Sequence, residues 1–120
     1  MEKKVLNLSV SKQWFDMIST GEKKEEYREI KPYWVSRLYL NEDEKLTPKM
    51  VRQLTQDLIK FGNDVDVCQV PYTHVLFING YGDDKPRIEK EIESISIGNP
   101  KKGWCPDEFL DKEYFVIKFK

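Results

Sequence analysis

The chain has 120 residues, with 20 basic and 21 acidic side chains and a formal net charge of −1 at pH 7. This balance argues against a general nucleic-acid coat, which carries a basic excess, but it leaves room for a local basic pocket. The length predicts one domain with a single modest core. No segment approaches membrane-spanning length, and the start of the chain leads directly into a strand pattern. We therefore expect a cytoplasmic protein without a membrane partner.

The first part of the chain predicts a strand, a short helix and a glycine turn. Residues 5–10 place apolar side chains at every second position, which is typical of a half-buried strand. Ser11 is a suitable N-cap for a helix that continues to about Thr20. Gly21 then stands where a helix end favours a left-handed residue.

Residues 21–29 are almost wholly charged and form the segment in which we expect function. On a helix, side chains of like charge would stand four residues apart, which is unfavourable. On a strand, the signs alternate along one face, which carries Glu22, Lys24, Glu26 and Arg28. We therefore predict a strand, with Glu26 and Arg28 facing one cleft and Lys23 at its rim. The alternative is a solvated edge strand whose charges prevent edge-to-edge pairing.

A short helix is expected after the charged strand, because Pro32 suits the first turn of a helix. Tyr33, Trp34 and Arg37 are spaced so that they could share one face. Two aromatic rings and an arginine near the charged strand could line a pocket for a planar ligand. The alternative is that Trp34 and Leu38 simply fill the core.

The best-marked helix begins at Thr47, which suits the N-cap, and Pro48, which suits the first helical position. Apolar residues then follow at helical spacing, at Met50, Val51, Leu54, Leu58 and Phe61, and Gly62 ends the pattern. We expect this helix to cover the core and assign it no chemistry. The flanking residues 41–46 and 63–71 are predicted to be connectors.

Three strands are expected in the second half. Residues 73–79 are apolar on both faces, as in a strand buried on both sides. Residues 87–97 form a long strand with a break in its alternation near Glu93 and Ser94, where we predict a β-bulge that helps a sheet curl. Residues 114–119 form the closing strand. The whole pattern predicts an α+β fold of about five strands that form a small barrel with flanking helices.

One loop and three reactive side chains complete the candidates. Asn79 and Tyr81 lie in a glycine-rich loop that could approach a ligand closely, although an ordinary hairpin would look the same. His74 is the only histidine and is expected to have a structural role. Cys68 and Cys105 have no metal-like spacing and are expected to be free thiols. We predict no metal site and no cofactor.

The motif around the charged strand resembles the signature of the ASCH family, within the PUA-like superfamily. That signature is G-x-K-x-x-E-x-R, and Gly21, Lys23, Glu26 and Arg28 fill it. The segment at 33–38, the loops at 79–81 and 98–104 and the final apolar strand agree as well. The resemblance covers residues 1–120 as a single domain, apart from a helical insert at about 41–70.

The resemblance implies a PUA-like β-barrel with a cleft between the first helix and the barrel that binds RNA or a nucleotide-like ligand. One branch of the family consists of amidohydrolases that remove the acetyl group from N4-acetylcytidine. The motif of that branch is G-x-K-x-x-T-x-R, with the lysine and threonine catalytic, together with a later glutamate. Lys23 matches the lysine, whereas Glu26 stands in place of the threonine.

We predict first that the protein binds RNA or a modified nucleotide in a cleft beside residues 23–28, because cations, aromatic rings and polar groups for a base edge are all present. The candidate ligand-binding residues are Lys12, Lys23, Glu26, Arg28, Tyr33, Arg37, Asn79 and Tyr81. The alternatives are a small amidohydrolase, in which Lys23 and Glu26 would be catalytic, and a protein-interaction domain.

Overall fold

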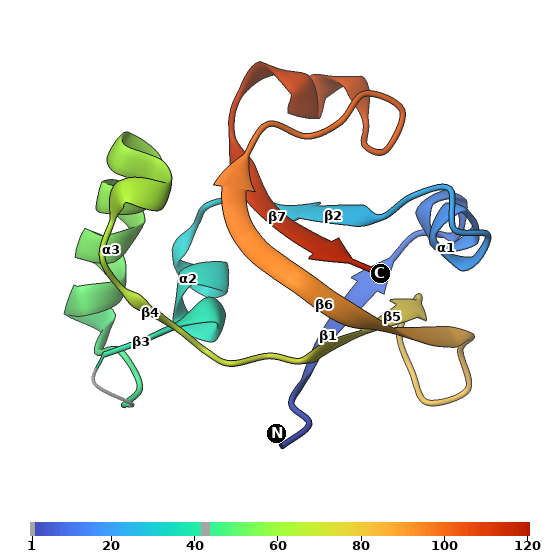
Figure 1. Ribbon diagram of the computed structural model, residues 1–120, viewed down its shortest axis with the longest axis horizontal. Helices are drawn as coiled ribbons and strands as arrows, with labels where there is room; N and C mark the ends of the chain where they lie inside the picture. Colours follow the sequence, from blue (N-terminus) through green and yellow to red (C-terminus); the bar gives the residue numbers. More distant parts are fainter. Residues whose placement is uncertain (1, 42–43) are drawn as a thin grey trace.

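A five-stranded mixed sheet forms the centre of the protein in a computed structural model that describes residues 2–41 and 44–120 (Figure 1). The strand order is β1-β5-β6-β7-β2. The strands are β1 (Val5–Val10), β2 (Glu25–Arg28), β5 (His74–Asn79), β6 (Arg87–Gly98) and β7 (Tyr114–Phe119). β1 and β5 run parallel, and every other neighbouring pair is antiparallel. The predicted α+β class and the predicted strand at Glu26 are therefore confirmed.

The helices flank this sheet rather than form a layer over all of it. They are α1 (Lys12–Ser19), α2 (Pro32–Leu38) and α3 (Pro48–Phe61), together with two short 3-10 helices, η1 (Gly62–Asp64) and η2 (Asp107–Asp111). α2 lies between the sheet and α3, whereas α1 and α3 are at opposite ends of the molecule (Figure 1). In the parts of the chain that the structure describes, no helix is long and apolar enough to cross a membrane.

A second, two-stranded sheet corrects the prediction that the residues around α3 are only connectors. β3 (Tyr39–Leu40) pairs antiparallel with β4 (Cys68–Gln69). Strands of two residues are too short to show an alternating pattern, so no sequence pattern predicts them. Of the predicted connector at 41–46, Glu42 and Asp43 lie outside the described residues.

Local signals explain where α3 begins and ends. The hydroxyl oxygen of Thr47 accepts a hydrogen bond from the backbone N–H of Met50 at 3.2 Å, as expected of an N-cap. Gly62 ends the helix with a φ of +58°, in the region that glycine adopts most readily. The predicted apolar face of α3 includes two residues that do not cover the core, however, because Met50 and Phe61 are exposed.

The predicted bulge in β6 lies between Ile92 and Ser94. Before it, β6 pairs with β5, and from Ile92 onward it pairs with β7. One extra residue bends the strand and increases its twist. Consequently β6 curves through the middle of the sheet and carries the ladder from β5 round to β7 (Figure 1).

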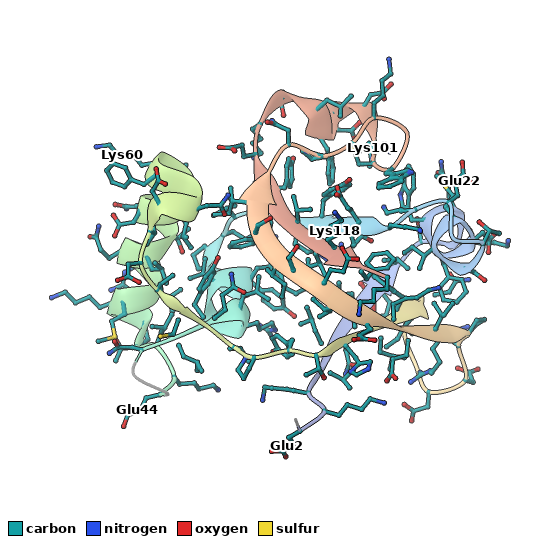
Figure 2. The ribbon with its side chains drawn as sticks, viewed as in Figure 1. Glu2, Glu22, Glu44, Lys60, Lys101 and Lys118 are labelled. Atoms are coloured by element: carbon teal, nitrogen blue, oxygen red, sulfur yellow. The ribbon has the colours of Figure 1, made fainter. Side chains whose placement is uncertain are left out.

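The ladder is open, because its two edge strands, β1 and β2, are not paired with each other. Apolar side chains of the sheet and of α2 form the core on its concave side, and among them the rings of Phe77 and Phe119 lie 4.9 Å apart. Charged side chains such as Lys60, Lys101 and Glu44 extend outward from the ribbon (Figure 2). The curl of the sheet brings the edge strand β2 close to the end of β1, and the candidate site lies there.

Candidate functional site

A cleft of about 590 Å³ opens where β2 approaches the end of β1. This volume lies within the range of small-molecule sites in proteins. α1, α2 and the segment that contains η2 form its walls. Its lining residues are Asn7, Ser9, Val10, Ser11, Trp14, Lys23, Glu26, Tyr27, Arg28, Glu29, Lys31, Tyr33, Trp34, Tyr81, Cys105, Pro106, Phe109 and Tyr114.

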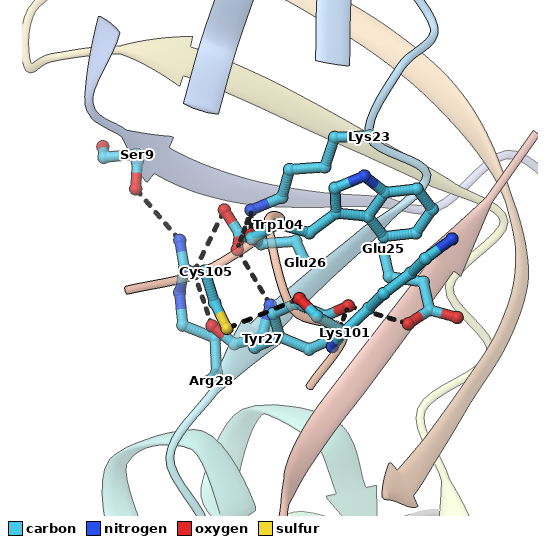
Figure 3. A network of polar contacts seen from close by, with 9 residues as sticks. All are labelled: Ser9, Lys23, Glu25, Glu26, Tyr27, Arg28, Lys101, Trp104 and Cys105. Atoms are coloured by element: carbon cyan, nitrogen blue, oxygen red, sulfur yellow. Dashed lines mark hydrogen bonds and ion pairs between the residues drawn. The ribbon is translucent and has the colours of Figure 1, made fainter. Parts of the chain in front are cut away.

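Lys23 lies at the floor of this cleft rather than at its rim, which corrects the prediction. Its backbone N–H donates to the carbonyl of Met17 at 3.0 Å, so the segment before β2 is held against α1 and the side chain enters the interior. Only 1% of Lys23 is exposed. Its Nζ donates to the backbone carbonyl of Trp104 and to Glu26 Oε1, the latter at 3.2 Å (Figure 3). The ammonium also lies 4.6 Å from the centre of the Trp14 ring.

Glu26 is buried between two cations. Its Oε1 accepts from Lys23 and from the backbone N–H of Tyr27, at 2.9 Å. Its Oε2 lies 3.4 Å from Nη1 of Arg28. β2 is an edge strand, as the alternative of a solvated charged edge requires. Glu26 is buried, however, so that alternative is wrong for this residue.

Arg28 joins the two open edges of the sheet. Its Nη2 donates to the carbonyl of Ser9 on β1, and its Nη1 donates to the carbonyl of Tyr27, both at 2.9 Å (Figure 3). The guanidinium carbon also lies 5.4 Å from the centre of the Trp34 ring. These neutral partners and Glu26 fix the guanidinium in one orientation.

The floor carries one more positive charge than negative charge. Burial lowers the pKa of the Lys23 ammonium, Glu26 opposes this shift, and Arg28 adds to it. Burial also raises the pKa of the Cys105 thiol, which lines the same cleft. The arrangement presents fixed donors and one carboxylate, so it suits a polar group that has both acceptors and a donor.

Aromatic rings form most of the walls. Trp14 and Trp34 lie on opposite helices, and Phe109 and Tyr114 stack on each other with ring centres 4.8 Å apart. Two tyrosines at the cleft are unusually exposed: Tyr33 by 51% and Tyr81 by 84%. Rings that remain exposed beside a polar floor are available to a planar ligand.

Five of the eight predicted ligand-binding residues line the cleft: Lys23, Glu26, Arg28, Tyr33 and Tyr81. The other three do not. Lys12 pairs with Asp16 at 2.6 Å on the exposed side of α1. Arg37 lines a different cavity, and Asn79 ends β5 beside Val10 but is not among the lining residues.

The sequence patterns miss several lining residues. They predict no role at the site for Trp14, Cys105, Phe109 or Tyr114. The Trp104 carbonyl had no detectable signal, because any residue type supplies that acceptor. The loop that contains Trp104 is part of the resemblance to the ASCH family. In the structure, this loop accepts a hydrogen bond from Lys23 and donates one to the hydroxyl of Tyr27 on β2.

Of the three reactive side chains considered from the sequence, Cys105 lines the cleft, whereas His74 and Cys68 do not. Nδ1 of His74 lies 2.8 Å from the hydroxyl of Thr73, as in the structural role expected. Both cysteines are free, with Cys68 exposed and Cys105 buried. Across residues 2–41 and 44–120, no group of three His, Cys, Asp or Glu side chains could hold a metal ion.

The comparisons with known proteins give no further information. No protein-family model matches the chain, and no curated protein or solved structure is detectably similar to it.

Proposed function

We propose that the cleft binds the base of a nucleotide, either free or within single-stranded RNA. One observation carries this proposal: the buried group of Lys23, Glu26 and Arg28 lies beneath walls made of aromatic rings. Bases outside a duplex are recognised by stacking on aromatic side chains and by hydrogen bonds to their edges. The cleft offers both kinds of contact.

The polar floor fits a base better than it fits an apolar ligand. The surplus positive charge of Lys23 and Arg28 favours a carbonyl oxygen or a phosphate. Glu26 Oε2 accepts an exocyclic amino group with little reorganisation, because its contact with Arg28, at 3.4 Å, is long for a hydrogen bond. An apolar ligand would bury these charges without compensation.

We also propose that the chain belongs to the ASCH family and that its sheet corresponds to a PUA-like barrel. The motif residues Lys23, Glu26 and Arg28 meet at one cleft beside the first helix, which supports the assignment. The Arg28–Ser9 hydrogen bond joins the two edge strands, as expected of a sheet curled toward closure.

Calorimetric titration of the wild-type protein with AMP, CMP, GMP and UMP tests the proposed function. We expect saturable binding of at least one nucleotide and no comparable binding of ribose 5-phosphate, which carries the sugar and phosphate without a base. Equal affinity for the sugar phosphate would show that the base is not recognised. Binding of none of the nucleotides would overturn the proposal.

A second candidate is a small amidohydrolase that acts on an N4-acylated cytidine. It is favoured by the position of Lys23, which matches the catalytic lysine of that motif, at the floor of the cleft, and burial shifts the pKa of this lysine in the direction that a general base requires. Lys23→Met should abolish turnover of N4-acetylcytidine, measured by the release of cytidine. Absence of turnover by the wild-type protein would remove this candidate, since Glu26 would then not replace the threonine of the catalytic motif.

A further inference from the structure

A second cavity, of about 730 Å³, lies between the segment before β1, α2 and the segment that enters β5. Four of its lining residues are cationic, Lys3, Lys4, Arg37 and Lys45, and only Glu2 is acidic. The chain as a whole has nearly equal numbers of basic and acidic residues. This cavity is therefore a local basic site on a nearly neutral protein.

The cations of this site are held mainly by neutral groups. Lys3 pairs with Glu89 at 2.7 Å, but within residues 2–41 and 44–120 no carboxylate lies within ion-pair distance of Lys4 or Arg37. The Lys4 ammonium lies 5.8 Å from the centre of the Tyr72 ring. The Tyr72 hydroxyl donates to the carbonyl of Arg37 at 3.1 Å, which connects the two sides of the cavity.

The basic cavity adjoins the cleft along α2. The guanidinium carbon of Arg37 lies 3.5 Å from the centre of the Tyr33 ring, and its Nη1 donates to the Tyr33 carbonyl at 3.0 Å. Tyr33 lines the cleft, whereas Arg37 lines the cavity. The two residues are four positions apart, which is about one helical turn, or roughly 5.4 Å. A ligand that extends beyond the cleft over Tyr33 therefore meets Arg37 first.

We infer that this basic cavity binds backbone phosphates of a single-stranded RNA whose base occupies the cleft. The inference rests on the proposed function and extends it, because it makes the ligand an oligonucleotide rather than a free nucleotide. Cations that track a backbone beside an aromatic platform are the usual arrangement for single strands. The small number of cations limits the contacts to two or three phosphates, and each contributes about −0.7 to the slope of log K against log salt.

The experiment compares binding of a mononucleotide and a hexanucleotide RNA by wild-type protein, by Lys4→Gln/Lys45→Gln and by a matched control, Lys49→Gln/Lys60→Gln. The control lysines are exposed on α3 and line neither cavity. Arg37 is left intact because it contacts Tyr33. We expect the wild-type protein to bind the hexanucleotide more tightly than the mononucleotide. Lys4→Gln/Lys45→Gln should weaken the hexanucleotide roughly tenfold, reduce its salt slope by about 1.4 and leave the mononucleotide unchanged.

Other results have distinct meanings. The phosphate site is absent, while the proposed function stands, if the mononucleotide binds and the hexanucleotide binds no more tightly. The same conclusion follows if both double variants weaken hexanucleotide binding equally. If Lys4→Gln/Lys45→Gln weakens the hexanucleotide but no mononucleotide binds the wild-type protein, the phosphate site stands and base recognition in the cleft fails. Binding of neither overturns both. Competition by an oligoglutamate as strong as that by the hexanucleotide would assign the cavity to an acidic peptide and overturn the inference.

Discussion

Glu26→Ala is expected to lower the free energy of unfolding by about 3–5 kcal/mol, the usual cost of removing one partner from a buried ion pair. Only 5% of Glu26 is exposed, and its carboxylate lies between Lys23 and Arg28. Without it, two cations face each other in an interior site and the backbone N–H of Tyr27 loses its acceptor. The pKa of Lys23 would then fall further, because Glu26 is the main group that raises it.

Urea denaturation, with an unchanged m-value, measures this effect. Lys23→Met should be less destabilising, because Glu26 keeps Arg28 and Tyr27 as partners while the cost of burying an ammonium disappears. Glu22→Ala, at an exposed position three residues before the strand β2, should change stability by no more than about 0.5 kcal/mol. A loss with Glu26→Ala as small as that with Glu22→Ala would mean that the buried charge group does not form.

Tyr81→Ala is expected to weaken nucleotide binding by about 1–3 kcal/mol, which is the contribution of one stacked base and corresponds to roughly 5–150-fold in affinity. Stability should hardly change, because 84% of Tyr81 is exposed. Tyr33→Ala should act in the same direction, because Tyr33 is an exposed lining residue as well. Calorimetry measures both affinities.

Phe61→Ala is the matched control for these tyrosine variants. Phe61 is an exposed aromatic residue on α3 and does not line the cleft. Its loss should leave nucleotide affinity unchanged. If Phe61→Ala weakens binding as much as Tyr81→Ala does, or if neither tyrosine matters, then the aromatic walls do not hold the base.

Much of the fold could be predicted from local patterns. The alternation of charge around Glu26 identified a strand against the helix propensity of its residues, and the break in alternation near Ser94 located the bulge. Both signals follow from which side chains share a face of a strand. Thr47 and Pro48 located the start of α3 because capping depends on neighbouring residues alone.

The site could be predicted only in part, because its geometry depends on segments far apart in the sequence. Lys23 is buried because a loop eighty residues later supplies the carbonyl of Trp104, and no local pattern reports this contact. Arg37 has the spacing of a cleft residue, yet it turns to the neighbouring basic cavity. Lys12 was among the predicted ligand-binding residues, but it forms an exposed ion pair with Asp16 instead.

The chain has three tryptophans, and all of them report on the cleft. Trp14 and Trp34 line it, and the Trp104 carbonyl accepts from Lys23 at its floor. A titration with the best-binding nucleotide, monitored by ¹⁵N-correlated NMR of the indole N–H groups, therefore shows whether a base enters the cleft. We expect the Trp14 and Trp34 resonances to shift with one common dissociation constant while the backbone amides of α3 stay in place. Saturable binding that moves α3 and leaves these indole resonances unchanged would contradict base binding in the cleft.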